Sequence, residues 1–458
     1  MGYTSYPLPP ATVSADTPIA GDAQRFLQDT DVPGDWWTLF GSPTLTSLVE
    51  QALRAYPDLA AAQAALDQAH DNLIAAEGAQ FPQVNGTAQT GRQRSTSGKT
   101  LDVFGAGVTV SYLIDAFGSV QRSIEASAAT EENARFQLEA TYLTLTSNVI
   151  TAAIQEASLS AQIAAEQDII TAQSQELDLL NQQFELGAVA RGDVLQQQSQ
   201  LAATQASLPP LQKQLEQTRN TLAILTGGYP ANTQVPDIQL ADLRLPSDLP
   251  LSLPSNLVQQ RPDIRASEAT LHNTSALIGV ATANLFPQFN VTGSLTESSS
   301  EVGQFFVGAN TGWSVIAGLT APIFRGGTLR AQQRAAYDAF DKAAAQYRLT
   351  VLNAFANVAN ALAALQLDAE NVRTQLYAEQ TAEQSLDITM QRFQAGAIAY
   401  LALLDAQRTY QQARIALVIA QANRFSDTVA LFQSLGGGWW NRQDAPEFHD
   451  AMGLASIP

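Results

Sequence analysis

The chain contains one long pattern twice, and this duplication limits its possible folds more than any other feature. Residues 57–87 align without a gap on residues 262–292, at an offset of 205 positions. The offset has grown to 209 where "LAILTGG" (222–228) meets "LFQSLGG" (431–437). Repeats of about two hundred residues are too long for a solenoid. We therefore predict one domain built from two equivalent halves, each with the same order of elements.

The stretch between the two halves is rich in proline, which predicts a linker. Together with the duplication, this divides the chain into five parts. The predicted parts are an N-terminal extended segment at 1–43, a first repeat at 44–228, a linker at 229–254, a second repeat at 255–437 and a C-terminal tail at 438–458.

Each half contains runs in which apolar residues alternate with small or polar ones. In the clearest run, Phe104, Val108 and Ile114 are apolar, whereas Gly105 and Thr109 between them are not. A period of two over about ten residues predicts a β-strand with one apolar face. We therefore expect four strands in the chain. Two lie at about 82–115 and two at about 287–322.

Very long helical patterns follow the strands in both halves. Ile163, Ile170 and Leu177 recur every seven residues, which is the spacing of a coiled-coil seam. Each pattern is interrupted at one glycine, Gly187 or Gly396, and glycine readily adopts the positive φ that ends a helix. We expect two helical hairpins with these glycines at their tips. The hairpins are predicted at 118–226 and at 326–435.

Charge and composition exclude several classes of function. The net charge is −19, which argues against nucleic acid as a partner. No run of eighteen apolar residues occurs, so we expect no transmembrane helix. The absence of cysteine excludes disulfides and thiolate metal sites. Because no GxSxG, P-loop, dinucleotide or HExxH pattern occurs, we expect no enzyme, no cofactor and no metal site.

Four strands with an apolar outer face would leave an open sheet. Such a sheet cannot lie in hydrocarbon, because its edges carry unpaired backbone groups. Two copies of the chain would close a barrel of eight strands, and three copies a barrel of twelve. Eight-stranded barrels are filled by their own side chains, so of these two assemblies only the trimer leaves an appreciable lumen. An ordinary sheet packed on a helix is the alternative for these strands.

Four stretches carry recognisable motifs: "WWTLFGSPTLTSLVEQAL", "RPDIRASEATL", "APIFRGGTLRA" and "LPPLQKQLEQTRNTLAILTGGYP". They resemble the TolC-like outer-membrane factors, in particular the lipoprotein efflux channels, and the resemblance runs from about residue 36 to 437. It implies a mixed α and β fold. An outer-membrane β-barrel of twelve strands in a homotrimer would be continued by a long coiled-coil α-helical barrel.

The resemblance also implies a function and a location. The chain would form the exit duct of a tripartite efflux pump in the outer membrane of a Gram-negative bacterium, with a long periplasmic extension, and would export small molecules. Its partners would be a periplasmic adaptor, an inner-membrane transporter of the RND class and outer-membrane lipid. Lipoprotein members carry an acylated cysteine, and this chain contains no cysteine. We therefore expect the signal peptide and lipid anchor to be missing from this chain.

The resemblance points to acidic residues at the tips as parts of a gate. Asp405 matches the gate aspartate of the second repeat, and Asp193 matches the acidic tip position of the first. Two positions depart from the family. Ala402 stands where many relatives carry an acid, and Ile398 where some carry a basic residue. These departures weigh against a salt-bridged gate, although Arg191 offers Asp193 a different partner.

In a trimer, three copies of Asp405 would form a ring that repels itself and attracts cations. We expect Leu401 and Leu404 to pack the constriction beside this ring. The plainer interpretation is that Asp193 and Asp405 only stabilise helix N-termini through the helix dipole. Adaptor docking is expected at the hairpin tips, through Gly187, Ala188, Val189, Arg191, Gly396, Ala397 and Ile398.

Trp313 lies on the apolar side of a strand-like run, and we expect it at the membrane interface, where tryptophan is enriched. Two other functions stay open. The same channel fold could serve type I protein secretion, in which the cargo is a polypeptide. The chain could also be a structural coiled-coil protein that has no barrel.

Overall fold

The computed structural model describes residues 24–442, apart from 29, 95, 97, 99, 252–253, 302 and 304–310. Most of the predicted N-terminal segment and C-terminal tail therefore lie outside the described residues. The chain divides into two compact units. The strand unit comprises Ala61–Leu138 and Asp263–Val351, and the hairpin unit comprises Met1–Ala60, Glu139–Pro262 and Leu352–Pro458.

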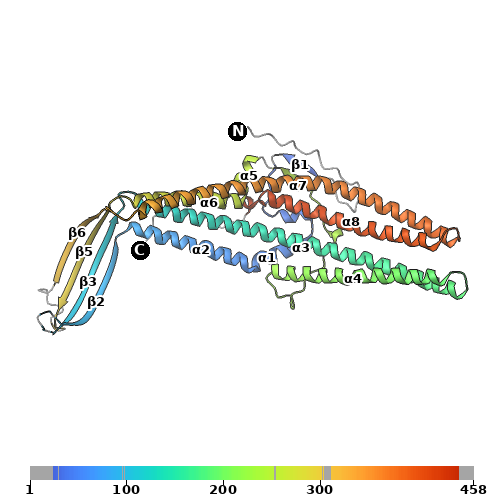
Figure 1. Ribbon diagram of the computed structural model, residues 1–458, viewed down its shortest axis with the longest axis horizontal. Coiled ribbons are helices and arrows are strands. Elements are labelled where there is room, and N and C mark those ends of the chain that lie inside the picture. The colour runs from blue at the N-terminus through green and yellow to red at the C-terminus, as the bar shows by residue number, and fades with distance from the viewer. Residues whose placement is uncertain are drawn as a thin grey trace. The chain divides into compact units, whose positions relative to one another are not determined.

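The main elements of each repeat follow one another in the same order: two short helices, two strands and two long helices (Figure 1). In chain order, the described elements are β1 (Arg25–Gln28), η1 (Trp36–Phe40), α1 (Pro43–Ala55), α2 (Pro57–Glu77), η2 (Gly78–Gln80), β2 (Gln83–Arg94), β3 (Thr100–Ile114), α3 (Ser119–Glu185), α4 (Arg191–Leu225), η3 (Leu240–Asp242), β4 (Asp248–Leu251), α5 (Pro254–Gln260), α6 (Pro262–Ala283), β5 (Gln288–Ser299), β6 (Thr311–Thr320), α7 (Thr328–Gln394), α8 (Tyr400–Ser434) and η6 (Trp439–Asn441).

The strand unit contains a four-stranded antiparallel sheet in the order β2-β3-β5-β6. Val108 pairs with Leu295, and Leu295 pairs with Trp313, so apolar side chains line one face. On the other face, Ser294 lies opposite Ser314, and their hydroxyl oxygens are 2.8 Å apart. The predicted alternation is therefore present. Within the described part of the chain, β2 and β6 each pair on one side alone, and both sheet edges are open.

The long helices have matching lengths in the two halves. α3 and α7 each contain 67 residues, and α4 and α8 each contain 35. α7 begins at Thr328, 209 positions after the start of α3 at Ser119. α4 and α8 are displaced by the same amount, from Arg191 to Tyr400. A duplicated chain predicts this equality, because each helix then has one counterpart of the same length.

α7 is the one described helix that is long and apolar enough to cross a membrane by length and composition alone. The sequence contains no long apolar run, so this helix was not expected to qualify. The difference arises because alanine raises the mean hydropathy of α7 without forming such a run. Ala354, Ala361 and Leu365 of α7 are buried against the rest of the chain, at the spacing of a helix packed on other helices.

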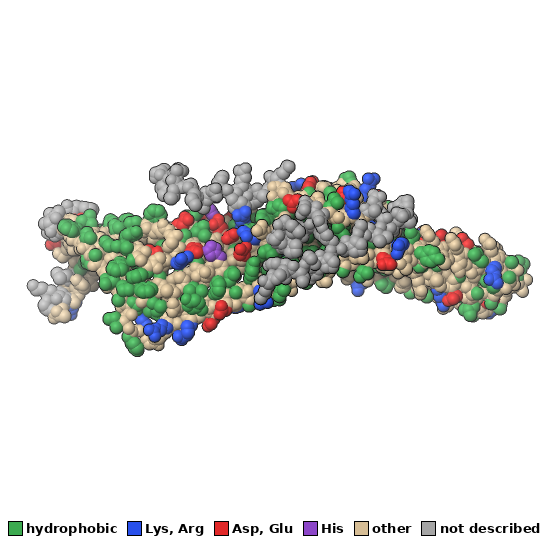
Figure 2. Space-filling view, turned by 90° about the horizontal axis from the view of Figure 1, so that it is seen from above, with side chains coloured by type: hydrophobic (Ala, Val, Ile, Leu, Met, Phe, Trp, Pro, Cys, Tyr) green, Lys and Arg blue, Asp and Glu red, His purple; other side chains and the backbone are tan. Residues whose placement is uncertain are grey.

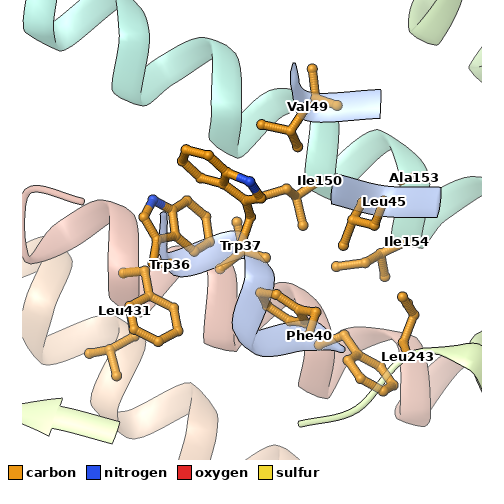
Figure 3. Close-up of a cluster of buried hydrophobic side chains, with 14 of the residues drawn as sticks. Trp36, Trp37, Phe40, Leu45, Val49, Ile150, Ala153, Ile154, Leu243 and Leu431 are labelled. Carbon is orange, nitrogen blue, oxygen red and sulfur yellow. The ribbon is translucent and has the colours of Figure 1, made fainter. Parts of the chain in front are cut away.

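The core of the hairpin unit contains segments that sequence pattern assigned to connections. Trp36 of η1 is fully buried (Figure 3). The centroid of its ring lies 5.2 Å from that of Phe432 of α8, and the two rings are stacked. From 229–254, Ile238 and Leu249 are also buried in this core. β1 pairs in parallel with β4, which joins the two segments. The described part of 1–43 is therefore more than an extended segment, and 229–254 is more than a linker.

A buried carboxylate attaches segment 229–254 to the long helix α3. Glu156 is fully buried and accepts two hydrogen bonds from Arg219 of α4, from Nε at 3.0 Å and from the terminal nitrogen at 2.8 Å. Its other oxygen accepts a bond from the backbone N–H of Ile238 at 3.2 Å. Burial raises the pKa of Glu156, and the bonds from Arg219 oppose that rise. Proline content alone cannot reveal this attachment, because it depends on residues far apart in sequence.

Two glycines form equivalent joints where α4 and α8 end. Gly227 has φ of +75°, and a Cβ placed on it would lie 2.4 Å from the backbone oxygen of Ala55. Gly436 has φ of +98°, and its Cβ would lie 2.8 Å from the backbone oxygen of Gln260. Each joint therefore packs the end of a returning helix against the end of a short helix, α1 or α5. Only glycine fits at either position.

We predict that Gly227→Ala destabilises the protein more than Gly187→Ala does. Gly187 also has positive φ, but nothing lies within 4 Å of its Cβ position. Backbone strain, about 1–3 kcal/mol, should therefore be common to both variants. The close approach of Ala55 should add about 1–3 kcal/mol for Gly227. Thermal unfolding followed by circular dichroism in detergent measures the difference, and equal shifts in Tm would contradict the close-packed joint.

Candidate functional site

The first hairpin ends in a helix-terminating turn built on Gly187, which has φ of +76°. The N–H of Gly187 donates to the backbone oxygen of Phe184 at 2.9 Å, and the N–H of Ala188 donates to that of Gln183 at 2.8 Å. This is a Schellman motif, which satisfies the last carbonyls of a helix. The structure places Gly187 in the turn that the sequence predicts.

The second hairpin repeats this turn. Gly396 has φ of +68° and donates from its N–H to Phe393 at 2.8 Å, while Ala397 donates to Arg392 at 2.9 Å. Val189 and Ile398 follow the glycines in the two turns, and both are half-buried. The predicted tip residues of each hairpin therefore lie in or next to its turn, and both turns are seen at the right of Figure 1.

The two candidate acids have different local roles. An oxygen of the Asp193 carboxylate accepts a bond from the backbone N–H of Ala190 at 3.2 Å, so Asp193 caps the start of α4. Arg191 forms no ion pair with Asp193 or with any other described residue. Asp405 lies further into α8 and is exposed. The hydroxyl of Thr409 donates to its backbone oxygen at 2.9 Å, but its carboxylate accepts no hydrogen bond from the described residues. The helix-capping interpretation thus accounts for Asp193 and leaves Asp405 unexplained.

The two leucines expected beside Asp405 also differ. Leu401 is 63% exposed and lies four residues before Asp405, on the same face of α8. Leu404 is only 2% exposed and packs inside the chain, in a cluster with Leu180 and Val194 of the first hairpin. The expectation that Leu404 lines a constriction is therefore wrong in this conformation. Leu404 lies on the face of α8 that packs against α3 and α4.

Beneath the tips lies a buried polar cluster that sequence reasoning missed. The hydroxyl of Tyr400 donates to Gln197 at 2.6 Å, and the amide nitrogen of Gln197 donates to the backbone oxygen of Gln173 at 2.9 Å. Gln197 also donates to Glu176 at 3.3 Å, and Gln407 donates to the same carboxylate oxygen. These bonds join α3 and α4 of the first hairpin to α8 of the second.

Burial within this cluster changes the acidity of its members. It raises the pKa of Glu176, and the bond from Gln407 opposes that rise. It also raises the pKa of the Tyr400 hydroxyl. The sequence contains one indication of this cluster. Ile163 and Ile170 belong to one row of the heptad pattern, and Gln173, three residues after Ile170, belongs to the second row, where apolar residues normally pack. A polar residue in such a row indicates a specific partner on the neighbouring helix.

Further side-chain bonds connect α8 to the first hairpin, away from the tips. Arg408 donates from Nε to Gln200 at 2.6 Å, and Gln411 donates to Glu166 at 2.9 Å. One turn further on, Arg414 donates to Asp168 at 2.8 Å. These bonds hold α8 of the second hairpin against α3 and α4 of the first.

Comparison with known proteins gives consistent results. The sequence model described as "Outer membrane efflux protein" matches residues 48–228 and 253–437. The pyoverdine export outer membrane protein OpmQ of Pseudomonas putida is 32% identical, with 96% of each chain covered. The cation efflux system protein CusC of Escherichia coli is 29% identical, with 88% of each covered.

Among solved structures, the outer-membrane channel OprN matches with a TM-score of 0.85 and 29% identity, over 95% of this chain and 99% of that one. The predicted resemblance to TolC-like outer-membrane factors is confirmed by these matches. The chain belongs to the outer membrane efflux protein family.

Proposed function

We propose that three copies of this chain form the outer-membrane exit duct of a tripartite efflux pump. The observation that carries this proposal is the four-stranded sheet with two open edges and one apolar face. In hydrocarbon those edges need partners, and further copies of the chain supply them. Three copies give twelve strands and leave room for a lumen. The polar face, with residues such as Thr109, Ser294 and Ser314, would line that lumen.

The family assignment places the protein in the outer membrane of a Gram-negative bacterium. Hydrophobic side chains gather on the left of the face seen in Figure 2, where the strand unit lies. We assign the membrane to the sheet, because the alternation of its side chains fits a barrel wall. The hairpin unit would extend into the periplasm and meet a periplasmic adaptor, and through it an inner-membrane transporter of the RND class.

Cargo selection belongs to that transporter in this proposal. The similar relatives are named for different cargoes, pyoverdine for OpmQ and cations for CusC. Adaptor docking would use the two tip turns, with Gly187, Ala188, Val189 and Arg191 in the first. Gly396, Ala397 and Ile398 would serve in the second.

The tips also supply the proposed gate. Asp405 and Leu401 share the exposed face of α8, so three copies could converge around the channel axis. Like charges in a narrow lumen repel one another and attract cations. Asp193 can contribute only if its carboxylate faces the lumen while it caps α4. Leu404 packs inside the chain and is left out of this gate.

We predict that Asp405→Asn reduces the preference of the channel for cations and weakens its block by divalent cations. The substitution removes the charge and preserves the size of the side chain. In planar bilayers under a KCl gradient, the reversal potential should move toward zero. Asp242→Asn removes the same charge from an exposed position in segment 229–254 and is the control. If Asp405→Asn and the control behave alike, and adding Asp193→Asn changes nothing, the gate lies elsewhere.

We predict that Trp313→Lys impairs membrane insertion, whereas Ser314→Lys on the neighbouring residue does not. Trp313 is 78% exposed on the apolar face, and Ser314 lies on the polar face. A lysine facing lipid costs up to about 2–4 kcal/mol near the midplane and less near the interface. The heat-stable protein recovered from the outer membrane measures insertion. Equal recovery of the two variants would mean that the lipid-facing side has been assigned to the wrong face.

A further inference from the structure

Inside the strand unit, the first repeat meets the second along one junction, formed by α3 with α6 and by β3 with β5. Three contacts hold its helical part together: one between a histidine and a glutamate, and two hydrogen bonds donated by asparagine side chains. Nε2 of His272 lies 2.9 Å from a carboxylate oxygen of Glu125. The amide of Asn133 donates to the backbone oxygen of Ala266 at 2.7 Å, and that of Asn273 to the backbone oxygen of Ala126, also at 2.7 Å.

The duplication creates a second set of surfaces with the same geometry. α7 and β6 are the counterparts of α3 and β3, while α2 and β2 are the counterparts of α6 and β5. Within the described residues, β6 and β2 are the open edges of the sheet. One molecule therefore carries both halves of a further junction, and a second copy can complete it. Head-to-tail contacts of this kind close into rings.

The side chains at the counterpart positions complement one another. Arg334 replaces Glu125 and Asp67 replaces His272, so a basic and an acidic side chain face each other again, on exchanged helices. Lys342 replaces Asn133, and Gln68 replaces Asn273. Both replacements retain an N–H donor, and the acceptors in the original junction are backbone oxygens that every residue carries. All three contacts can therefore form again.

The charges along the two helices support this assignment. Although the chain carries a net charge of −19, the first turns of α7 present four exposed basic residues. They are Arg330, Arg334, Lys342 and Arg348, and their counterparts on α3 are Gln121, Glu125, Asn133 and Glu139. α2 presents Asp67 and Asp71, both exposed. The stretch of α7 from Arg330 to Arg348 also contains two exposed acids, Asp338 and Asp341, and keeps an excess of positive charge, whereas α2 contains no lysine or arginine. This difference in charge favours contact between two copies.

The strand register follows from the same correspondence. Gln83 pairs with Ser111 and its counterpart Gln288 pairs with Thr320, which fixes the offset between β3 and β6 at 209. Gly107 of β3 pairs with Thr296 of β5. The counterpart of Gly107 is Ile316, and the counterpart of Thr296 is Gly91.

We propose that α7 and β6 of one copy bind α2 and β2 of the next, with Arg334 against Asp67 and Ile316 opposite Gly91. This rests on the proposed function, and it adds to it the residues and the strand register of the contact between copies. The junction between copies then repeats the junction inside the chain.

Disulfide formation tests the register directly, because the chain has no cysteine of its own. Paired residues on neighbouring antiparallel strands have Cα atoms about 4.5–5.5 Å apart, within reach of a disulfide. Inside one chain, β2 and β6 are separated by two strands, about 14 Å, so a bond must join two copies. Ile316→Cys should cross-link most efficiently with Gly91→Cys. Thr87→Cys, Gln89→Cys and Gln93→Cys, which lie on the same face of β2, should give less.

Charge exchange tests the helical contact. Arg334→Asp and Asp67→Arg should each shorten the half-life of the assembly in warm detergent by about two- to fivefold, as expected for an exposed ion pair. The double exchange should restore it. Arg330→Asp combined with Asp67→Arg should not, because Arg330 lies one turn away. Failure of the double exchange, or most efficient cross-linking at another position, overturns the proposed contact.

Conductance in planar bilayers separates this proposal from the function on which it rests. If the cysteine variants conduct after reduction but cross-link in another register, the channel stands and the proposed junction is wrong. If the unmodified chain forms no conducting assembly, the proposed function fails first, and the junction fails with it.

Discussion

The structure depends on the hydrogen bonds that the edges of its sheet must form. The described sheet has four strands, with open edges at β2 and β6. In water such edges can be solvated, but in hydrocarbon each unpaired group costs several kcal/mol. A chain with an apolar face on this sheet therefore needs further copies before it can enter a membrane. Assembly and insertion then become one requirement.

Duplication makes a closed ring of copies possible with one kind of contact, because the junction inside the chain can also form between copies. The halves agree where packing is demanding: Gly227 and Gly436 both meet a helix end too closely for any side chain. They differ at the tips, where Asp193 caps its helix while the counterpart position, Ala402, carries no acid. Asp405 is likewise found in one half alone, because its counterpart in the first half is Gln196. A channel of three copies would alternate these two kinds of hairpin.

The strands, the hairpins and the two-fold repetition were predictable, because periodicity and duplication can be read directly from the sequence. Alternation at Phe104 and Val108 predicted the strands, and heptads ending at Gly187 and Gly396 predicted the hairpins. What failed depended on distant contacts. Proline content hid the buried Ile238 and its bond to Glu156, and the heptads did not show that Leu404 turns inward. The polar Gln173 in the heptad row could indicate a partner, but the cluster around Glu176 and Gln197 joins three helices, so only the folded chain shows which residues meet.

In the assembly we propose, one chain forms a third of a closed barrel. The mass of the detergent-solubilised protein, measured by light scattering with the bound detergent subtracted, tests this claim most directly. The account predicts a single species of about three times the chain mass of 48.9 kDa. A stable, folded monomer that stays soluble in plain buffer would contradict it, because an apolar sheet with open edges could not exist in that form.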